Sequence, residues 1–306
     1  MPKRIRNNYA LAPIFAFAMI VAGSNAFAGG LLSVEFDPAK FPNPTLIDNQ
    51  YWPLLPGNTA RTFTYVGEAD DECAINEISV TPGDHKSFAN PPYSLVTAQV
   101  VLDQAWVVEL GENEDCNAET ATSDDDLDEL TYDWYAQDMN QNIWYMGEAS
   151  RDFGEPCPSL DDVPLGTPRG AWPDDDLFLE CTGGSWEAGE PGQEEGEIIG
   201  EPGIVVPGDY PTGGKKIKPG TFYMQEVAEG AEDMAKILRI NASLSVEDGV
   251  LPGVYEECRK VKEWNPFEPG ASVEQKWYCT GGNGLVLIKG IGGGPTESEV
   301  LMRVTP

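Results

Sequence analysis

Residues 130–148 read LTYDWYAQDMNQNIWYMGE, two aromatic-rich runs on either side of a short polar centre. The first run alternates apolar and polar residues, which is the period of a strand with one buried face. Two such runs joined by a few polar residues predict an antiparallel hairpin. A tight turn at 139–140 would place Trp134 opposite Tyr145, so that large aromatic side chains meet across the two strands.

The same polar centre permits a second interpretation, a calcium-binding loop. Asp138, Asn140 and Asn142 match the first three ligand positions of a D-x-N-x-N loop, in which alternate oxygens surround a hard cation. The match then ends, since Ile143 stands where the loop needs glycine and Ala149 where it needs a bidentate acid. The hairpin is therefore favoured, and calcium at these three residues is the alternative.

Two acidic runs are the other calcium candidates. Clustered carboxylates repel one another until a cation bridges them, although acidic runs are more often solvated loops. The candidate ligands are Asp124 and Asp126 in SDDDLDE (123–129), and Asp174, Asp175 and Asp176 in PDDDLFLE (173–180).

Strand-like runs of β-branched and aromatic residues recur along the whole chain. Examples are SLVTAQVVL (94–102), LRINASLSV (238–246) and VLMRV (300–304). The 33 Gly and 25 Pro divide the chain into short segments and leave little room for helices. Only GAEDMAKIL (230–238) suggests a helical turn or two. The sequence therefore predicts an all-β fold.

A weak internal repeat suggests how the strands are organised. TFTYVGE (62–68) is echoed by TFYMQEV (221–227), and the hairpin that begins at Trp134 is echoed from Trp277. Two related halves predict an antiparallel meander that closes into a barrel or a strongly curled sheet, because closure removes exposed edges. The expected organisation is a signal peptide (1–28), an extended lead-in (29–60) and a single β domain (61–306), in which 149–213 form a long acidic Gly/Pro-rich loop insertion.

The N-terminus has the features of a secretory signal. A basic start precedes the apolar run YALAPIFAFAMIVAG (9–23), which is short for a membrane span, and Ala26-Phe27-Ala28 fits a signal-peptidase site. We expect cleavage after Ala28 and an exported protein, periplasmic or extracellular.

The chain is strongly acidic, with a formal net charge of −32 that loss of the three basic residues in the signal would bring to −35. Such a surface repels nucleic acid and anionic membranes, so neither is expected as a partner.

The six cysteines form an even set, and disulfides are the default in an exported protein. If 254–279 form a hairpin centred on residues 268–269, Cys258 lies directly opposite Cys279, within reach of a disulfide. Two further pairs are expected: Cys157–Cys181, which is symmetric about the turn TPRGAWP (167–173), and Cys73–Cys116, which remains.

Six segments together resemble a widespread group of exported bacterial proteins: LIDNQYWPLLPG, TFTYVGE, DWYAQDMNQNIWYMGE, GSWEAG, PGIVVPGDY and GAEDMAKIL, in this order. The resemblance spans most of the mature chain. It implies a β-rich exported protein and no particular reaction, because that group has no established activity. The cysteines and SDDDLDE depart from the group's pattern and are interpreted as local adaptations.

The sequence lacks the residues on which several common catalytic, zinc and nucleotide sites depend. His85 is the single histidine, no G-x-S-x-G elbow is present, and no cysteines or glycines have zinc or phosphate-loop spacing. Glu148 and Glu187, near tryptophans, permit glycoside hydrolysis by paired carboxylates. We therefore predict a non-catalytic binding or surface protein for a small apolar or carbohydrate ligand, with calcium as a candidate cofactor. The alternative is an Asp/Glu-dependent hydrolase that acts on carbohydrate.

Overall fold

The computed structural model describes most of the chain beyond residue 29. In this part of the chain, no helix is long and apolar enough to cross a membrane, and helical structure consists of two short 3-10 turns. The described residues are 30–69, 72–111, 115–120, 122–123, 126–153, 185–192, 198–228, 232–246, 253–267, 273–282, 284–292 and 298–305.

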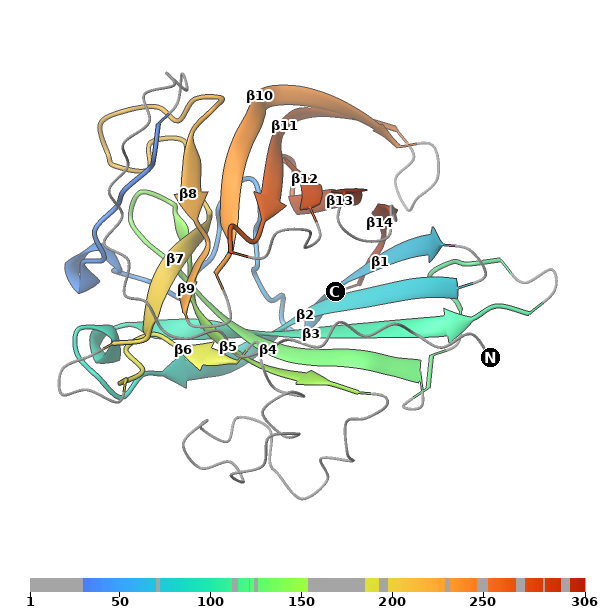
Figure 1. Cartoon of the computed structure of the whole chain (residues 1–306), viewed down its shortest axis with the longest axis horizontal. Coiled ribbons are helices and arrows are strands. Elements are labelled where there is room, and N and C mark those ends of the chain that lie inside the picture. Colours follow the sequence, from blue (N-terminus) through green and yellow to red (C-terminus); the bar gives the residue numbers. More distant parts are fainter. Residues whose placement is uncertain are drawn as a thin grey trace.

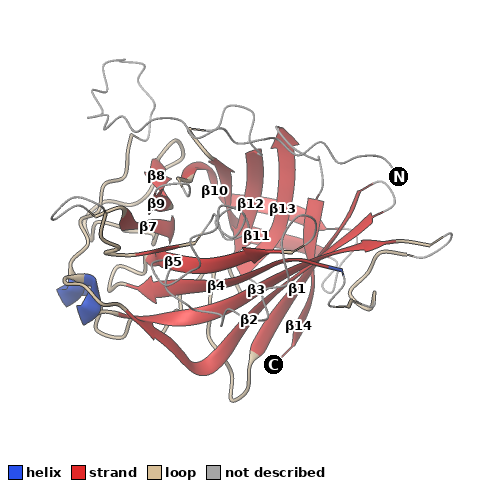
Figure 2. Cartoon of the chain, turned by 60° about the horizontal axis from the view of Figure 1, so that its bottom comes forward, coloured by secondary structure: helices blue, strands red, loops and turns tan. Residues whose placement is uncertain are grey.

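Strands dominate the described chain (Figure 2). The 3-10 turns are η1 (Pro38–Lys40) and η2 (Tyr93–Leu95), and the strands are β1 (Arg61–Ala69), β2 (Glu72–Ser87), β3 (Thr97–Glu109), β4 (Leu127–Gln137), β5 (Ile143–Asp152), β6 (Trp186–Glu187), β7 (Gly200–Val206), β8 (Phe222–Met224), β9 (Glu226–Ala228), β10 (Met234–Val246), β11 (Gly253–Trp264), β12 (Val273–Cys279), β13 (Gly284–Gly292) and β14 (Ser298–Thr305).

One antiparallel sheet curls into a nearly closed barrel (Figure 1). Its strand order is β8-β10-β11-β12-β13-β14-β1-β2-β3-β4-β5-β7-β9, with β6 paired to β5 off this path. β8 pairs with β10 and β9 pairs with β7, and only Gln225 separates β8 from β9. The segment 222–228 therefore connects the two ends of the sheet. The predicted all-β barrel or curled sheet is confirmed.

The hairpin of β4 and β5 is present, but its register differs by one residue from the expected one. Tyr135, and not Trp134, lies opposite Tyr145. The loop is longer than a two-residue turn, because the N–H of Asp138 donates to the carbonyl of Asn142 and residues 139–141 form the tip. Gln141 adopts the left-handed conformation, φ 61°, that typically ends a three-residue hairpin loop. The expected pairing of Trp134 with Tyr145 is therefore wrong.

Two segments that were expected to lack strands supply them. Met234–Leu238 of GAEDMAKIL belong to β10 and are not helical, because Met234–Lys236 pair with β8 and the whole stretch continues the ladder with β11. β6 and β7 arise within 149–213, which was expected to be a loop insertion.

Two disulfides are present among the described residues. Cys73 is bonded to Cys116, and Cys258 to Cys279. The second pair has the expected register, since Arg259 pairs with Tyr278 and the two cysteines are next to them. Disulfides are typical of proteins that fold in an oxidising compartment outside the cytoplasm. The expected pair Cys157–Cys181 lies outside the described residues.

The lead-in, residues 30–60, contributes side chains to the main hydrophobic core. Its backbone joins the sheet at a single bridge, between Leu31 and Phe222. Ile47 and Leu54 are fully buried. The side chain of Gln137 at the end of β4 accepts the backbone N–H of Asn49 at 2.8 Å, which fixes the lead-in to the barrel.

Candidate functional site

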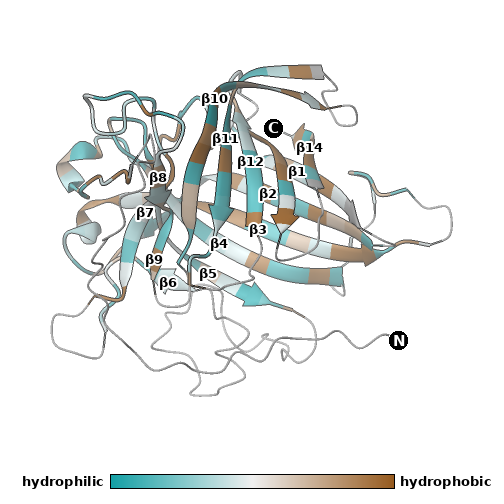
Figure 3. Cartoon of the chain, turned by 45° about the horizontal axis from the view of Figure 1, so that its top comes forward, coloured by the Kyte–Doolittle hydropathy of each residue, from teal (hydrophilic) through white to brown (hydrophobic). Residues whose placement is uncertain are grey.

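The barrel contains a half-open cavity of about 310 Å³. Along β4 it is lined by Glu129, Thr131, Asp133 and Tyr135, every second residue, so the apolar residues between them face the other side of the sheet. Figure 3 shows this alternation of hydrophilic and hydrophobic residues along the strands. Glu129 is exposed whereas Asp133 is 6% exposed, so the cavity opens near the start of β4 and deepens along the strand.

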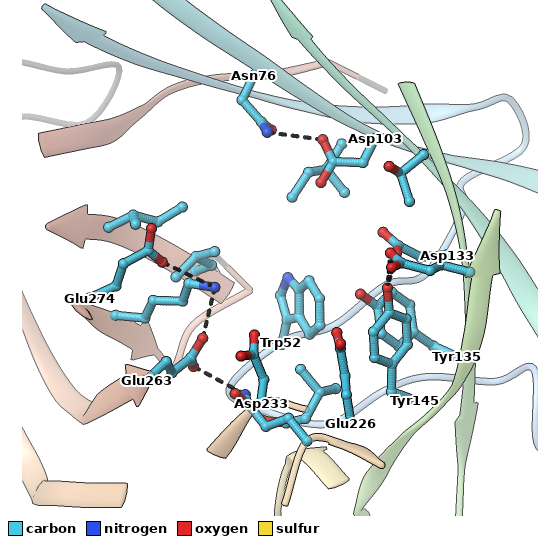
Figure 4. A pocket seen from close by; sticks show the side chains of 18 of the residues that line it. Trp52, Asn76, Asp103, Asp133, Tyr135, Tyr145, Glu226, Asp233, Glu263 and Glu274 are labelled. Carbon is cyan, nitrogen blue, oxygen red and sulfur yellow. Dashed lines mark hydrogen bonds and ion pairs between the residues drawn. The ribbon is translucent and has the colours of Figure 1, made fainter. Parts of the chain in front are cut away.

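Acidic side chains from opposite walls of the barrel point into this one space (Figure 4). A single cation, Lys276, accompanies them among the lining residues. No three His, Cys, Asp or Glu side chains of the described chain are grouped closely enough to hold a metal ion. The nine carboxylic residues are Asp103, Glu129, Asp133, Glu148, Glu226, Asp233, Glu263, Glu274 and Glu299.

Asp133 and Glu148 are direct cross-strand partners on β4 and β5. Both side chains hydrogen-bond the hydroxyl of Tyr145, which lies 2.7 Å from Glu148 Oε2 and closer still to Asp133 Oδ1. A phenol has one proton to donate, so it can donate to one carboxylate only. The other carboxyl group must carry a proton and donate to the phenol oxygen. Burial, partly offset by the bond from Tyr145, raises the pKa of Asp133 to about 7.

Three further carboxyl groups that line the cavity around Asp133, which together form its acidic wall, are protonated more readily than usual. Burial, reinforced by the charge of Asp133, raises the pKa of Asp103 and of Glu148 well above the ordinary values. Burial and the nearby Glu148 do the same to the pKa of Glu226. Desolvation disfavours a lone carboxylate, and like charges add to the penalty. These carboxyl groups therefore hold their protons to a higher pH than exposed carboxyl groups do.

The opposite wall carries the lysine. Lys276 Nζ lies 2.7 Å from a carboxylate oxygen of Glu263 and 3.6 Å from one of Glu274. Burial by itself lowers the pKa of Lys276, but Glu263 and Glu274 outweigh that effect and raise it. Gln225, at the break between β8 and β9, also donates to Glu263 at 3.1 Å. One wall of the cavity thus carries a lysine between two carboxylates, whereas the wall around Asp133 has no lysine or arginine among its lining residues.

Trp52 of the lead-in forms the floor of the cavity. Its ring lies 5.2 Å from that of Tyr135 and 6.0 Å from that of Tyr278, both in edge-to-face geometry. The residue is 5% exposed, and its indole Nε1 is buried without a hydrogen-bond partner. Figure 4 shows the indole between the Glu263 side and the Tyr135 side of the cavity.

The three residues of the proposed calcium loop come together, but their polar atoms hold the hairpin tip. The buried carboxylate of Asp138 accepts the backbone N–H groups of Asn140 and Asn142 at 2.8 and 2.9 Å, the Asn142 amide at 2.7 Å and the Trp144 indole at 3.1 Å. Asn142 Oδ1 accepts the N–H of Gly208. This hydrogen bonding favours the turn interpretation.

Of the other proposed calcium ligands, Asp126 alone belongs to the described residues. Asp126 accepts hydrogen bonds from the backbone and side chain of Ser123 at an exposed strand entry. Asp124, Asp174, Asp175 and Asp176 lie outside the described residues, so calcium there stays a prediction.

The two glutamates that suggested a hydrolase point in different directions. Glu148 lines the cavity, whereas Glu187 forms an ion pair with Lys86 at 2.8 Å and is absent from the cavity lining. Lys86 also lies over the ring of Trp134, on the side of β4 away from the cavity. The carboxyl partner of Glu148 inside the barrel is Asp133.

Sequence reasoning missed most of the cavity, although one signal was available. In the repeat that matches Trp134 with Trp277, Asp133 corresponds to Lys276 and Tyr135 to Tyr278. Both strands thus place a charged residue and a tyrosine on the polar face, two residues apart.

Comparisons with known proteins add little to this geometry. No family model matches the chain, and no curated protein matches it. A proposed exported protein with a YmcC-like fold from Bacteroides fragilis is similar over 82% of this chain and 98% of its own, with 12% identity and a TM-score of 0.33. A proposed lipoprotein from Parabacteroides distasonis is similar over 84% and 99%, with 8% identity and a TM-score of 0.29. At these TM-scores neither likeness assigns a fold or a function to this chain.

Proposed function

We propose that this is an exported, non-catalytic binding protein that holds a small organic cation in the barrel. The observation that carries the proposal is the cavity lining, in which nine carboxylic residues face one lysine. A cation placed against the wall of Asp133, Glu148 and Glu226 would stabilise the ionised carboxylates that burial and mutual repulsion disfavour. Aromatic rings beside carboxylates are a common environment for organic ammonium groups.

The size and lining of the cavity select among cations. Its volume is that of about ten waters, which suits an organic molecule of about a dozen heavy atoms better than a bare ion. The acids are spread over opposite walls, so a ligand with some extent can reach more than one of them. An apolar ligand fits poorly, because it would leave buried carboxyl groups without partners.

Cyclohexylamine and cyclohexanol test this proposal, since they share a ring and differ in charge. Calorimetric titration at matched ionic strength is expected to show that the amine binds at least about tenfold more tightly than the alcohol. This ratio corresponds to a difference of about 1.4 kcal/mol in binding free energy. The affinity for the amine should rise from about pH 5.5 to about pH 8, because deprotonation exposes the negative charge that it binds.

The matched variants are Glu226→Gln, in the cavity, and Glu256→Gln, on an exposed part of β11. The first should weaken amine binding and the second should not. Equal binding of the amine and the alcohol, or an equal effect of both variants, would contradict the proposal. A parallel titration with calcium chloride shows whether calcium assists binding or competes with it.

A second candidate function is hydrolysis of a glycosidic bond by Asp133 and Glu148. The observation that favours it is their shared hydroxyl, which requires that one of the two carboxyl groups be protonated, as the acid of a glycosidase is. Release of nitrophenol from a panel of 4-nitrophenyl glycosides checks it. We expect a rate no higher than that of buffer. Turnover that disappears in both Asp133→Asn and Glu148→Gln would instead identify an enzyme.

A further inference from the structure

Two unpartnered polar atoms in the cavity lining narrow the class of cation, an inference that rests on the proposed function. The first atom is the indole N–H of Trp52, which is buried and has no acceptor in the described structure. A buried donor without a partner is costly, and an ammonium group cannot satisfy it because ammonium has no acceptor. The ligand must therefore also carry an oxygen.

The second unpartnered atom is an acceptor. Asn76 uses its Nδ2 to donate to Asp103 at 2.9 Å, and its Oδ1 is buried without a partner. A group that both accepts and donates satisfies such a pair of atoms, and a hydroxyl is the simplest one. Trp52 and Asn76 lie in different parts of the cavity (Figure 4), so the ligand needs an acceptor at one position and a donor at another.

The distribution of the acids points in the same direction. The cavity is lined from β4, β5, β9 and the residue before β10, by Glu129, Glu148, Glu226 and Asp233. A linear diamine offers donors only at its ends and would place methylene groups against the remaining carboxyl groups. A polyhydroxylated ring offers donors around its circumference, and its apolar face can pack on the Trp52 ring. An amino acid is disfavoured, because its own carboxylate would be repelled by the lining.

We infer that the ligand is an amino sugar with a free ammonium group. The ammonium lies against the wall of Asp133 and Glu148, and the ring packs on Trp52, whose N–H donates to a ring or hydroxyl oxygen. Lys276, already held by Glu263 and Glu274, stays on the opposite wall.

Titration of the full mature protein with glucosamine, cyclohexylamine and glucose at about pH 7 tests this inference. Glucosamine is expected to bind at least about tenfold more tightly than cyclohexylamine, the effect of one or two added hydrogen bonds. Glucosamine and cyclohexylamine that bind equally would overturn the amino-sugar assignment and leave the organic-cation function intact. Failure of both amines, or glucose that binds as tightly as glucosamine, would overturn the proposed function itself.

Trp52→Phe isolates the indole donor, because it keeps an aromatic floor and removes the N–H. It should bring the glucosamine affinity to within about threefold of the cyclohexylamine affinity. Trp134→Phe is the matched control, since Trp134 lies against Lys86 and Phe88 outside the cavity lining, and should leave the ratio unchanged. An unchanged ratio in both variants would overturn the role of Trp52. The comparison of ligands on the unmodified protein does not depend on either variant folding.

Discussion

Raising the pH from about 5 to about 8 is expected to lower the melting temperature of the ligand-free protein by several degrees. The pKa of Asp133 in the folded protein is about 7, and burial raises those of Asp103, Glu148 and Glu226 well above the ordinary range. In the unfolded chain these groups titrate near pH 4. Between the two values the folded state binds more protons, so the free energy of unfolding falls as the pH rises.

A scan of melting temperature in buffers of constant, moderately high ionic strength measures this dependence, with surface repulsion screened. Glu148→Gln, which removes one of the titrating groups, should flatten the curve, whereas Glu256→Gln on the exposed surface should not. A melting temperature that is constant or rises over this range would rule out protonated carboxyl groups in the barrel. Saturating ligand should reduce the loss of stability at high pH, because the cation neutralises the same wall.

Asp138→Ala is expected to lower the free energy of unfolding by about 3 kcal/mol or more. The substitution leaves four N–H donors at a buried hairpin tip without their acceptor, and each unsatisfied buried donor costs about 1–3 kcal/mol. The melting temperature should fall by roughly 10 °C, given the sensitivity of chains of this size. Asp126→Ala, which removes an exposed cap, should cost less than about 1 kcal/mol.

Calcium distinguishes the two interpretations of that hairpin. If the Asp138 carboxylate serves the turn, the melting temperature of the unmodified protein is the same in calcium and in chelator at matched ionic strength. A saturable rise of several degrees with calcium that Asp138→Ala abolishes would instead establish an ion-binding loop.

The strands were predictable because period-2 patterning is local. The register of the Cys258–Cys279 pair followed from the expected hairpin centre at residues 268–269, because no bulge interrupts the ladder between 259–264 and 273–278. β10 shows where this reasoning fails. Its apolar residues at 238–246 suggest one buried face, but the register with β11 shifts around Asn241, which has φ 54°. Of that face, Ala242, Leu244 and Val246 are buried, whereas Leu238 and Ile240 are only partly buried.

The cavity could not be predicted for a different reason. Alternation identifies two faces of a strand but not which one faces inward, and the apolar face of 130–136 was the natural choice for a core. The lead-in and neighbouring loops cover that face in part, for example through Phe36 and Phe41 on Trp144. The polar face could then turn inward. Trp52 and Glu299 meet in one cavity only through the closure of the barrel, which no local pattern encodes.

The pairing of β1 with β14 determines how much of the chain must be available before the barrel can close. β1 pairs with β14 as well as with β2, and Trp52 packs against Tyr278, so these closing contacts form only after β12 and β14 have emerged. Contacts of such long sequence separation form slowly. A chain that emerges N-terminus first therefore leaves the barrel open until β14 has emerged, and the cavity is among the last features to form.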